Sequence, residues 1–348
     1  MSVVLKRIDA VEFAVHSIPQ SEKLLSLWGF KKLGQGKNKH ASQALWGQGQ
    51  IRIVLSQGND EQSYASKFVK KHGDGICNVT FQVDSAKDTY ETVVKRGAPS
   101  HTEPFSENGK VGKFHYAAIK AMGDVVHTFI NREGAQTFSA ALEVPLETVS
   151  TGGVGLFEVD HLTCNLGVGE LEKWASFYEK VFEFKETRFF HITTGRTGLI
   201  SKVMENKEGT VKIPLNEPTD KKSQIQEYID VNHGPGIQHL ALATKDILQT
   251  LPQLRKAGQD FLDVPDTYYE EVPARVKGIK EDLNQLKTHR ILADGDSSGY
   301  LLQIFSQNVV GPFFYEVIQR CGNRGFGEGN FKALFQAIER DQEKRGVL

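Results

Sequence analysis

This chain of 348 residues has no excess of positive or of negative charge. Its 42 lysines and arginines are balanced by 43 aspartates and glutamates, which gives a formal net charge of −1. Nucleic acids and anionic membrane surfaces usually select proteins with a basic excess, so we expect neither as a partner. No apolar run approaches the roughly 18 residues that a membrane-spanning helix requires, and we therefore expect no membrane-spanning segment.

Cysteines are also few, and none of them has a paired spacing. The three are Cys77, Cys164 and Cys321. The N-terminal sequence MSVVLKRIDAVEF has neither the apolar core nor the cleavage site of a secretory signal. An odd number of cysteines without such a signal predicts reduced thiols and a cytoplasmic location, and we interpret the three as core residues.

An internal repeat is the main feature that the sequence does contain. RIDAVEFAVHSIPQSEKLLSLWGFKKLG resembles FEVDHLTCNLGVGELEKWASFYEKVFEFKETR, HGDGICNVTFQVD resembles HGPGIQHLALATK, and DVVHTFINR is matched to YLLQIFSQN. These alignments superimpose three pairs of residues at offsets of 151, 161 and 176, namely Asp9 with Asp160, Ile76 with Ile237 and Phe129 with Phe305. The growing offset predicts insertions in loops of the second half, where insertions are tolerated.

Each half therefore repeats a pattern of one strand, one helix and further strands. In the second half, the apolar spacing from Leu171 to Val181 predicts a helix. Gly97 and Gly258 follow the matching helices of the two halves and are predicted to end them. The stretch from Thr137 to Gly155 is interpreted as a linker. We expect a ligand-free structural domain at 1–150 and a catalytic domain at 151–348.

Three residues on predicted strands of the second half form a candidate metal site. His161, His239 and Glu316 are separated by 78 and 77 residues. Two imidazoles and one carboxylate match the facial triad of non-heme Fe(II) oxygenases, which leaves coordination positions open. A 2-oxo acid and O₂ can occupy those positions. By ligand type alone, Mn, Zn or Co would also fit.

The first half lacks these ligands. Ala10 occupies the repeat position of His161, and Asn78 occupies that of His239. A single histidine on a strand is more often a core or surface residue than a ligand. Even spacing in one half and missing counterparts in the other half favour a shared metal role, with one active half and one structural half.

Other side chains near these strands are candidates for a substrate pocket. Phe314 lies two residues before Glu316, so the two share a strand face. Gln303 and Phe305 share a face of the preceding predicted strand. Gln238 directly precedes His239 and should point to the opposite face of a regular strand.

The C-terminal sequence GFGEGNFKALFQAIERDQEKRG predicts a glycine hinge followed by a helix. Its glycines resemble a nucleotide-binding loop only superficially, because no strand-turn-helix unit surrounds them. Asn330 is predicted as the N-cap, and Phe331 and Phe335 belong to one apolar stripe. The helix either packs on the core or closes over the metal site as a lid.

Taken together, these segments resemble a known family. The second half is similar to 4-hydroxyphenylpyruvate dioxygenase, of the vicinal oxygen chelate superfamily, through DHLTCN, IPLNEPTDKKSQIQEYI, GPGIQHLAL, LLQIF, FFYEVIQR and GFGEGNFKALF. The first half resembles the family's ligand-free domain more loosely, through the repeat. The resemblance implies an α+β fold of tandem βαβββ modules, in which two open, strongly curved barrels are followed by a C-terminal helix.

The resemblance also implies a reaction and a pocket. One Fe(II) per chain would be bound by His161, His239 and Glu316, and 4-hydroxyphenylpyruvate and O₂ would give homogentisate and CO₂ in tyrosine and phenylalanine catabolism. The reaction would combine oxidative decarboxylation, ring hydroxylation and side-chain migration, in a homodimer or homotetramer. The implied substrate-binding residues are Ser201, Asn216, Gln224, Gln238, Gln303, Phe305, Phe314, Phe326, Phe331 and Phe335.

Three alternatives remain open from the sequence. A 4-hydroxymandelate synthase would use the same substrate, metal and fold but hydroxylate the benzylic carbon. A non-catalytic binding protein of the same fold should lack at least one ligand, whereas all three are present. A metal-dependent isomerase or lyase of the same superfamily would consume no O₂.

Overall fold

The computed structural model describes residues 2–146, 153–193, 197–331, 343 and 346. In the first half, the elements are β1 (Arg7–Ala14), α1 (Ile18–Leu27), β2 (Lys31–Lys37), β3 (Ala41–Gln48), β4 (Ile51–Gly58), α2 (Tyr64–His72), β5 (Gly75–Gln82), α3 (Ala86–Lys95), β6 (Ser100–Asn108), β7 (Lys113–Lys120) and β8 (Val126–Glu133).

The second half begins after the segment that we interpreted as a linker, part of which lies outside the described residues. Its elements are β9 (Leu156–Asn165), α4 (Leu171–Phe182), β10 (Lys185–Thr193), β11 (Gly198–Glu205), β12 (Lys212–Pro218), α5 (Gln224–Asn232), β13 (Gly236–Thr244), α6 (Ile247–Lys256), α7 (Thr267–Arg275), α8 (Leu283–His289), β14 (Leu292–Asp296), β15 (Gly299–Phe305) and β16 (Phe314–Cys321).

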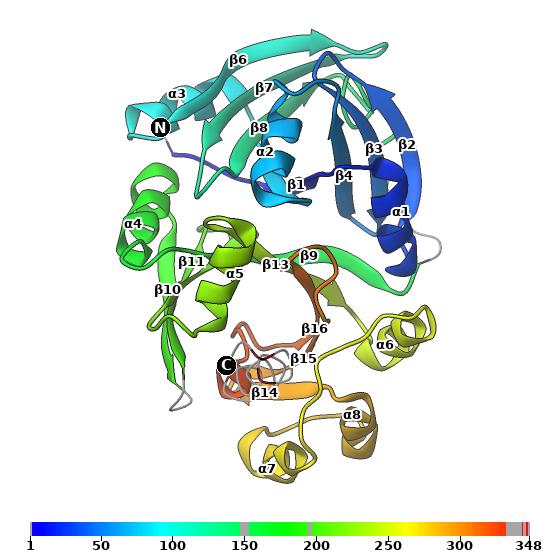
Figure 1. Cartoon of the computed structure of the whole chain (residues 1–348), viewed down its shortest axis with the longest axis vertical. Coiled ribbons are helices and arrows are strands. Elements are labelled where there is room, and N and C mark those ends of the chain that lie inside the picture. The colour runs from blue at the N-terminus through cyan, green and yellow to red at the C-terminus, as the bar shows by residue number, and fades with distance from the viewer. Residues whose placement is uncertain (1, 147–152, 194–196, 332–342, 344–345, 347–348) are drawn as a thin grey trace.

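Both halves form a curled eight-stranded sheet with the same strand order. The first sheet runs β2-β3-β4-β1-β5-β8-β7-β6, and the second runs β10-β11-β12-β9-β13-β16-β15-β14. In each sheet two βαβββ modules meet at a central antiparallel pair, β1 with β5 or β9 with β13. Figure 1 shows the two curved sheets one above the other, with α6, α7 and α8 outside the second. The predicted fold class is therefore confirmed.

The third repeat alignment was wrong by one strand. Strand β5 pairs in parallel with β8, and β13 pairs in parallel with β16, so β8 corresponds to β16 and not to β15. On β5, Asn78 lies two residues before the residue that pairs with Thr128. On β13, His239 likewise lies two residues before the residue that pairs with Glu316. Thr128 therefore occupies the position of Glu316. Two successive apolar strands of one module look alike in sequence, and only their pairing distinguishes them.

The insertion in the second half is therefore longer than the repeat alignment predicted. The residue offset between the halves grows from 161 at Asn78 and His239 to 188 at Thr128 and Glu316. The added residues include the two helices α7 and α8, which lie between α6 and β14. A longer insertion with its own helices thus replaces the short loop that we expected. The glycines predicted to end α3 and α6 do follow these helices, with φ of 103° at Gly97 and 98° at Gly258.

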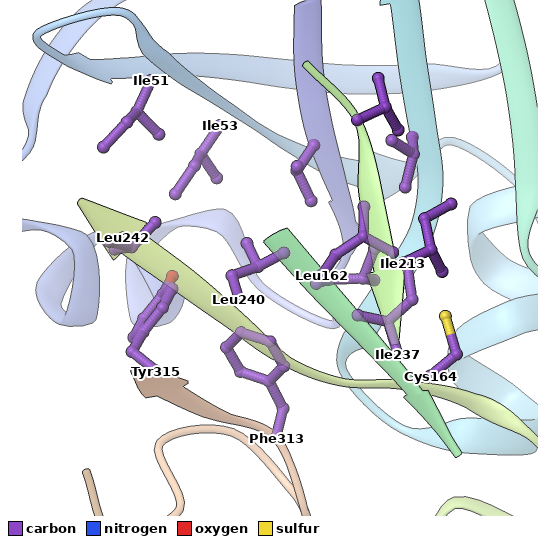
Figure 2. Close-up of a cluster of buried hydrophobic side chains, with 14 of the residues drawn as sticks. Ile51, Ile53, Leu162, Cys164, Ile213, Ile237, Leu240, Leu242, Phe313 and Tyr315 are labelled. Atoms are coloured by element: carbon purple, nitrogen blue, oxygen red, sulfur yellow. The ribbon is translucent and has the colours of Figure 1, made fainter. Parts of the chain in front are cut away.

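Strand alternation gives the central strands of the second sheet two different faces. His161 and His239 point into the hollow of this sheet, while their neighbours Leu162 and Leu240 are completely buried in the core. Figure 2 shows Leu240 and Leu242 near Ile51 and Ile53 of the first sheet. The sheets thus share one apolar core, and burial of these side chains stabilises the position of both strands that carry the histidines.

Aromatic contacts join the halves in a nearly symmetric way. On β8, His127 packs against Phe182 of α4, and its Nε2 lies 2.8 Å from Tyr178 Oη. On β16, Tyr315 packs against Trp28, which directly follows α1, at a centroid distance of 4.4 Å. The corresponding strand of each half therefore contacts the first helical segment of the other half.

The predicted helix after β16 begins earlier than expected, and most of it lies outside the described residues. The helical turn begins at residue 328, so Asn330 lies within it and is not its N-cap. Asn330 is fully buried, and its Oδ1 accepts a hydrogen bond of 2.5 Å from the Tyr268 hydroxyl. Its side chain is thus used for a long-range contact with α7. No helix in the described part of the chain is long and apolar enough to cross a membrane.

Candidate metal centre

Three neighbouring strands bring the predicted ligands together in the hollow of the second sheet. His161 lies on β9, His239 on β13 and Glu316 on β16, and all three are buried. Glu316 Oε2 is 3.3 Å from His161 Nε2 and 3.5 Å from His239 Nε2. One ligand atom from each residue lies within 4.8 Å of the other two, a separation that a single metal ion can bridge.

The residue before each histidine fixes the orientation of its ring. His161 Nδ1 is 2.9 Å from Asp160 Oδ1, and His239 Nδ1 is 3.2 Å from Gln238 Oε1. Hydrogen bonds at Nδ1 leave Nε2 of each ring directed toward Glu316. Metal-ligating histidines are commonly oriented in this way by a carboxylate or carbonyl at the second ring nitrogen.

Two β-bulges explain how consecutive residues can contact each other through their side chains. The β9–β13 register shifts at Asp160 and again at Gln238, so each of these residues is the extra residue of a bulge. A bulge redirects the side chains beside it. The expectation that Gln238 points away from the site was therefore wrong, because it assumed a regular strand.

An arginine holds Asp160 from the opposite side. Arg320 Nε donates a hydrogen bond to Asp160 Oδ2 at 2.6 Å, and Arg320 Nη2 donates one to Asp160 Oδ1 at 2.7 Å. Lys212 Nζ lies 3.6 Å from the same carboxylate. Such a two-point contact fixes the plane of the carboxylate. Burial opposes ionisation of Asp160, but the hydrogen bonds from Arg320 and His161 hold its pKa well below the ordinary value.

The electrostatics of the three ligands favour an ionised carboxylate. Burial opposes the charge on Glu316, but attraction and hydrogen bonding to His161 and His239 lower its pKa. Burial alone would lower the pKa of His161. The attraction of Glu316 and the hydrogen bond to Asp160 outweigh burial, so the pKa of His161 is raised. At His239 burial dominates and the pKa is lowered, which favours the neutral imidazole that a metal requires.

The donor set fits a divalent transition metal such as Fe(II). Glu316 Oε1 is buried and has no hydrogen-bond partner among the described residues. A buried carboxylate oxygen without a partner is costly, and a metal ion would satisfy it. The set of two imidazoles and one carboxylate suits iron but by ligand type also manganese, zinc or cobalt.

The cavity beside the ligands is small, and five phenylalanines form part of its lining. Its volume is about 50 Å³. Phe314 stacks on His239 at a centroid distance of 4.7 Å, and Phe326 meets the His161 ring edge-on at 5.2 Å. Phe331 contacts Phe190 at 4.9 Å across the cavity.

Most of the predicted pocket residues line this cavity. The structure brings together Ser201, Asn216, Gln224, Gln238, Phe305, Phe314, Phe326 and Phe331 around the three ligands. Gln303 is buried but does not line the cavity, because its amide lies against Gly327. Phe335 lies outside the described residues.

Six further lining residues were not predicted from the sequence. They are Thr163, Phe190, Leu199, Val203, Pro214 and Ile225. Four of them stand two residues from a predicted site residue on the same strand, so strict alternation would have found them. Phe190 lies on the edge strand β10, and nothing in its local sequence connects it with the site.

Two sequence families match successive parts of the chain. Residues 3–158 match "Hydroxyphenylpyruvate dioxygenase, HPPD, N-terminal". Residues 158–274 match the "Glyoxalase/Bleomycin resistance protein/Dioxygenase superfamily". The first match covers the half without metal ligands, and the second covers two of the three ligand strands.

Similarity to individual proteins extends over nearly the whole chain. A 4-hydroxyphenylpyruvate dioxygenase of Legionella pneumophila (strain Corby) is 42% identical over 98% of this chain and 97% of its own length. A protein named hemolysin VllY from Vibrio vulnificus is also 42% identical, over 98% of this chain and 96% of its own length. A variant of 4-hydroxymandelate synthase from Streptomyces coelicolor superimposes with a TM-score of 0.85 at 27% identity, covering 98% of this chain and 100% of that protein.

Proposed function

The chain belongs to the 4-hydroxyphenylpyruvate dioxygenase family, and from this premise we propose that it converts 4-hydroxyphenylpyruvate and O₂ to homogentisate and CO₂. The metal would be Fe(II), one per chain, bound by His161, His239 and Glu316. The observation that carries this proposal is the buried cluster of two imidazoles and one carboxylate, the ligand types of such iron sites, with one ligand atom of each residue within 4.8 Å of the others. The role in tyrosine and phenylalanine catabolism follows from the substrate.

When bound, Fe(II) would coordinate the 2-oxo acid of the substrate and activate O₂. The protein's own task is then to position the ring and to keep the site dry. Phe314 and Phe326 flank the two histidines and present flat apolar surfaces that compete for no metal position. Ser201, Asn216 and Gln224 line the same cavity, and we propose that they hydrogen-bond the phenol without adding a charge.

Asp160 and Gln238 would act through the histidines. Each would accept a hydrogen bond from Nδ1 through its side-chain oxygen, so both imidazoles keep Nε2 free for the metal. The fork from Arg320 prevents Asp160 from turning into the metal site itself.

The cavity must enlarge before substrate binds. A volume of about 50 Å³ is well below the roughly 300 Å³ at which pockets for small molecules usually begin. Phe331 and Phe326, which follow the last strand, narrow the cavity. We propose that this segment moves outward to admit substrate and then closes, which excludes water during the reaction.

A second candidate is 4-hydroxymandelate synthesis, favoured by the structural similarity to that synthase over the full length of the chain. The two reactions share the substrate and differ in the carbon that is hydroxylated. We favour homogentisate because a relative named 4-hydroxyphenylpyruvate dioxygenase has the higher identity, at 42%.

The deciding experiment is oxygen uptake by the Fe(II)-loaded protein with 4-hydroxyphenylpyruvate, followed by product identification by mass spectrometry and NMR. Homogentisate with one CO₂ per O₂ is the expected result. Hydroxymandelate would establish the second candidate. Binding of the substrate without oxygen uptake would overturn both and support a non-oxidative protein of the same fold.

A further inference from the structure

The first half contains a cavity at the place that corresponds to the metal centre. It has a volume of about 380 Å³, compared with about 50 Å³ for the cavity beside the metal ligands. The counterparts of the three ligands, Ala10, Asn78 and Thr128, all line it. This cavity is thus formed without rearrangement and is large enough for a small organic molecule.

One of the three carboxylates that line this cavity, Glu12, is held in place by uncharged side chains. Its Oε1 accepts a hydrogen bond of 2.5 Å from Ser56 Oγ and one of 3.5 Å from Gln43. Its Oε2 accepts one of 2.9 Å from Asn78 Nδ2. The amide of Asn78 is itself fixed, because its Oδ1 accepts from Thr128 Oγ1 at 3.0 Å. The network therefore orients the carboxylate toward the cavity and leaves its charge without a cationic partner within the described part of the chain.

Other charges around the cavity are neutralised or lie at its margin. Asp9 is engaged by the guanidinium of Arg132 at 3.0 and 2.7 Å. Lys39, His40 and Glu107 also line the cavity, but all three are exposed. The interior is therefore negative, which disfavours anions such as a 2-oxo acid.

Aromatic rings supply the walls. Phe105 and Tyr116 stack on each other at a centroid distance of 5.2 Å and 23° between their planes. Phe138 lies on the segment after β8 and also lines the cavity. Phe105 is 44% exposed although it is a large apolar residue, so part of this wall is accessible from outside. Such rings bind flat apolar groups and attract organic cations.

A metal ion is the less suitable occupant. Within the described residues, the one group of three or more potential His, Cys, Asp or Glu ligands is that of His161, His239 and Glu316. Among the described residues, Glu12 therefore belongs to no group of three such ligands close enough to hold an ion. An organic ammonium, in contrast, needs one carboxylate and an apolar wall.

We propose that the first-half cavity is a binding site for a small aromatic ammonium ion. Its N–H groups donate hydrogen bonds to Glu12, and its ring packs against Phe105, Tyr116 and Phe138. The charge-assisted hydrogen bond selects the cation, and the rings select the aromatic body. This site is separate from the metal centre and does not depend on the reaction proposed for it.

The test is isothermal titration of the full-length protein with 2-phenylethylamine, and with 2-phenylethanol and 3-phenylpropionate as neutral and anionic analogues. We expect one amine per chain, bound about tenfold or more tightly than the alcohol, since a hydrogen bond to a charged group commonly contributes that much. The anion should bind least well. Equal affinity for the amine and the alcohol would overturn the proposal.

Two variants locate the amine. Glu12→Gln should reduce its affinity about tenfold, to that of the alcohol, while Glu316→Gln, the same substitution at the carboxylate of the candidate metal centre, should leave it unchanged. Loss in Glu316→Gln with retention in Glu12→Gln would place the amine in the metal centre and overturn the proposal. If Glu12→Gln does not fold, Ala10→Leu fills the cavity beside an intact Glu12 network and should abolish binding; unchanged binding there would equally overturn it.

Discussion

Asp9 with Arg132 in the first half and Asp160 with Arg320 in the second form the same forked ion pair. In both halves the aspartate is the extra residue of a bulge in the central strand pair, and the arginine donates two hydrogen bonds to it. In the second half alone a histidine follows the aspartate, where the first half has Ala10. The bulge and its ion pair are therefore part of the shared fold.

The similarity extends to the segments that follow the last strands. The Arg132 guanidinium lies 5.6 Å from the centroid of the Phe138 ring, and that of Arg320 lies 5.6 Å from the centroid of the Phe326 ring. Each phenylalanine lines the cavity of its own half. The hollow, its bulges and its aromatic cover thus belong to both halves, while three side chains per half determine whether a candidate metal site is present.

The largest expected effect comes from making the second half resemble the first. His161→Ala introduces the residue that the first half has at Ala10, and it should abolish Fe(II) binding and oxygen uptake because it removes a ligand. The effect should exceed the roughly 10- to 100-fold loss of metal affinity that follows when a hydrogen bond to a ligand is removed. Metal titration and an oxygen electrode measure both effects. Thr128→Ala, at the counterpart of Glu316, should leave both unchanged. Turnover that survives His161→Ala would refute the assigned ligand set.

An intermediate effect is expected from the two aspartates. Asp160→Asn should weaken metal binding about 10- to 100-fold, because the hydrogen bond that orients His161 changes. Asp9→Asn should not affect metal affinity. Each variant leaves an arginine without its buried carboxylate, so both should lose stability by a similar amount, on the order of 3 kcal/mol.

Metal titration and urea unfolding of the same preparations separate the two contributions. If Asp9→Asn weakened metal binding as much as Asp160→Asn, the effect of Asp160 would be a general loss of stability rather than positioning of His161.

The smallest effect concerns the interface between the halves and appears only in acid. Burial lowers the pKa of His127 to about 4 from the ordinary 6.5. Between these values the unfolded chain binds a proton that the folded chain does not, so this residue makes the protein less stable as the pH falls below 6.5. His127→Gln has no group that titrates in this way. The free energy of unfolding of this variant, relative to that of the unmodified protein, should therefore rise by about 2 kcal/mol from pH 7 to pH 5.

Urea unfolding at several pH values checks this prediction. Tyr315→Phe is the matched control, because Tyr315 is the counterpart of His127 on β16 and does not titrate in this range. Its difference from the unmodified protein should be independent of pH. Parallel stability curves for His127→Gln and the unmodified protein would show that His127 is not the group responsible.

Much of the fold and the site could be predicted from local patterns. Period-two alternation places His161 and Leu162 on opposite faces of a strand, and the spacing from Leu171 to Val181 predicts α4, as observed. The internal repeat predicts paired modules. The errors share one cause: Gln238, the β8 alignment and the role of Asn330 all depend on contacts with distant residues.

By itself, the sequence determined the repeated modules, the chemical types of the candidate ligands and their absence from the first half. The tertiary structure decided which strands are neighbours and where each strand bulges. Strand order and register depend on hydrogen bonds between segments far apart in the chain, and local patterns carry no record of them. Only the pairing of β13 with both β9 and β16 brings residues 161, 239 and 316 to one point.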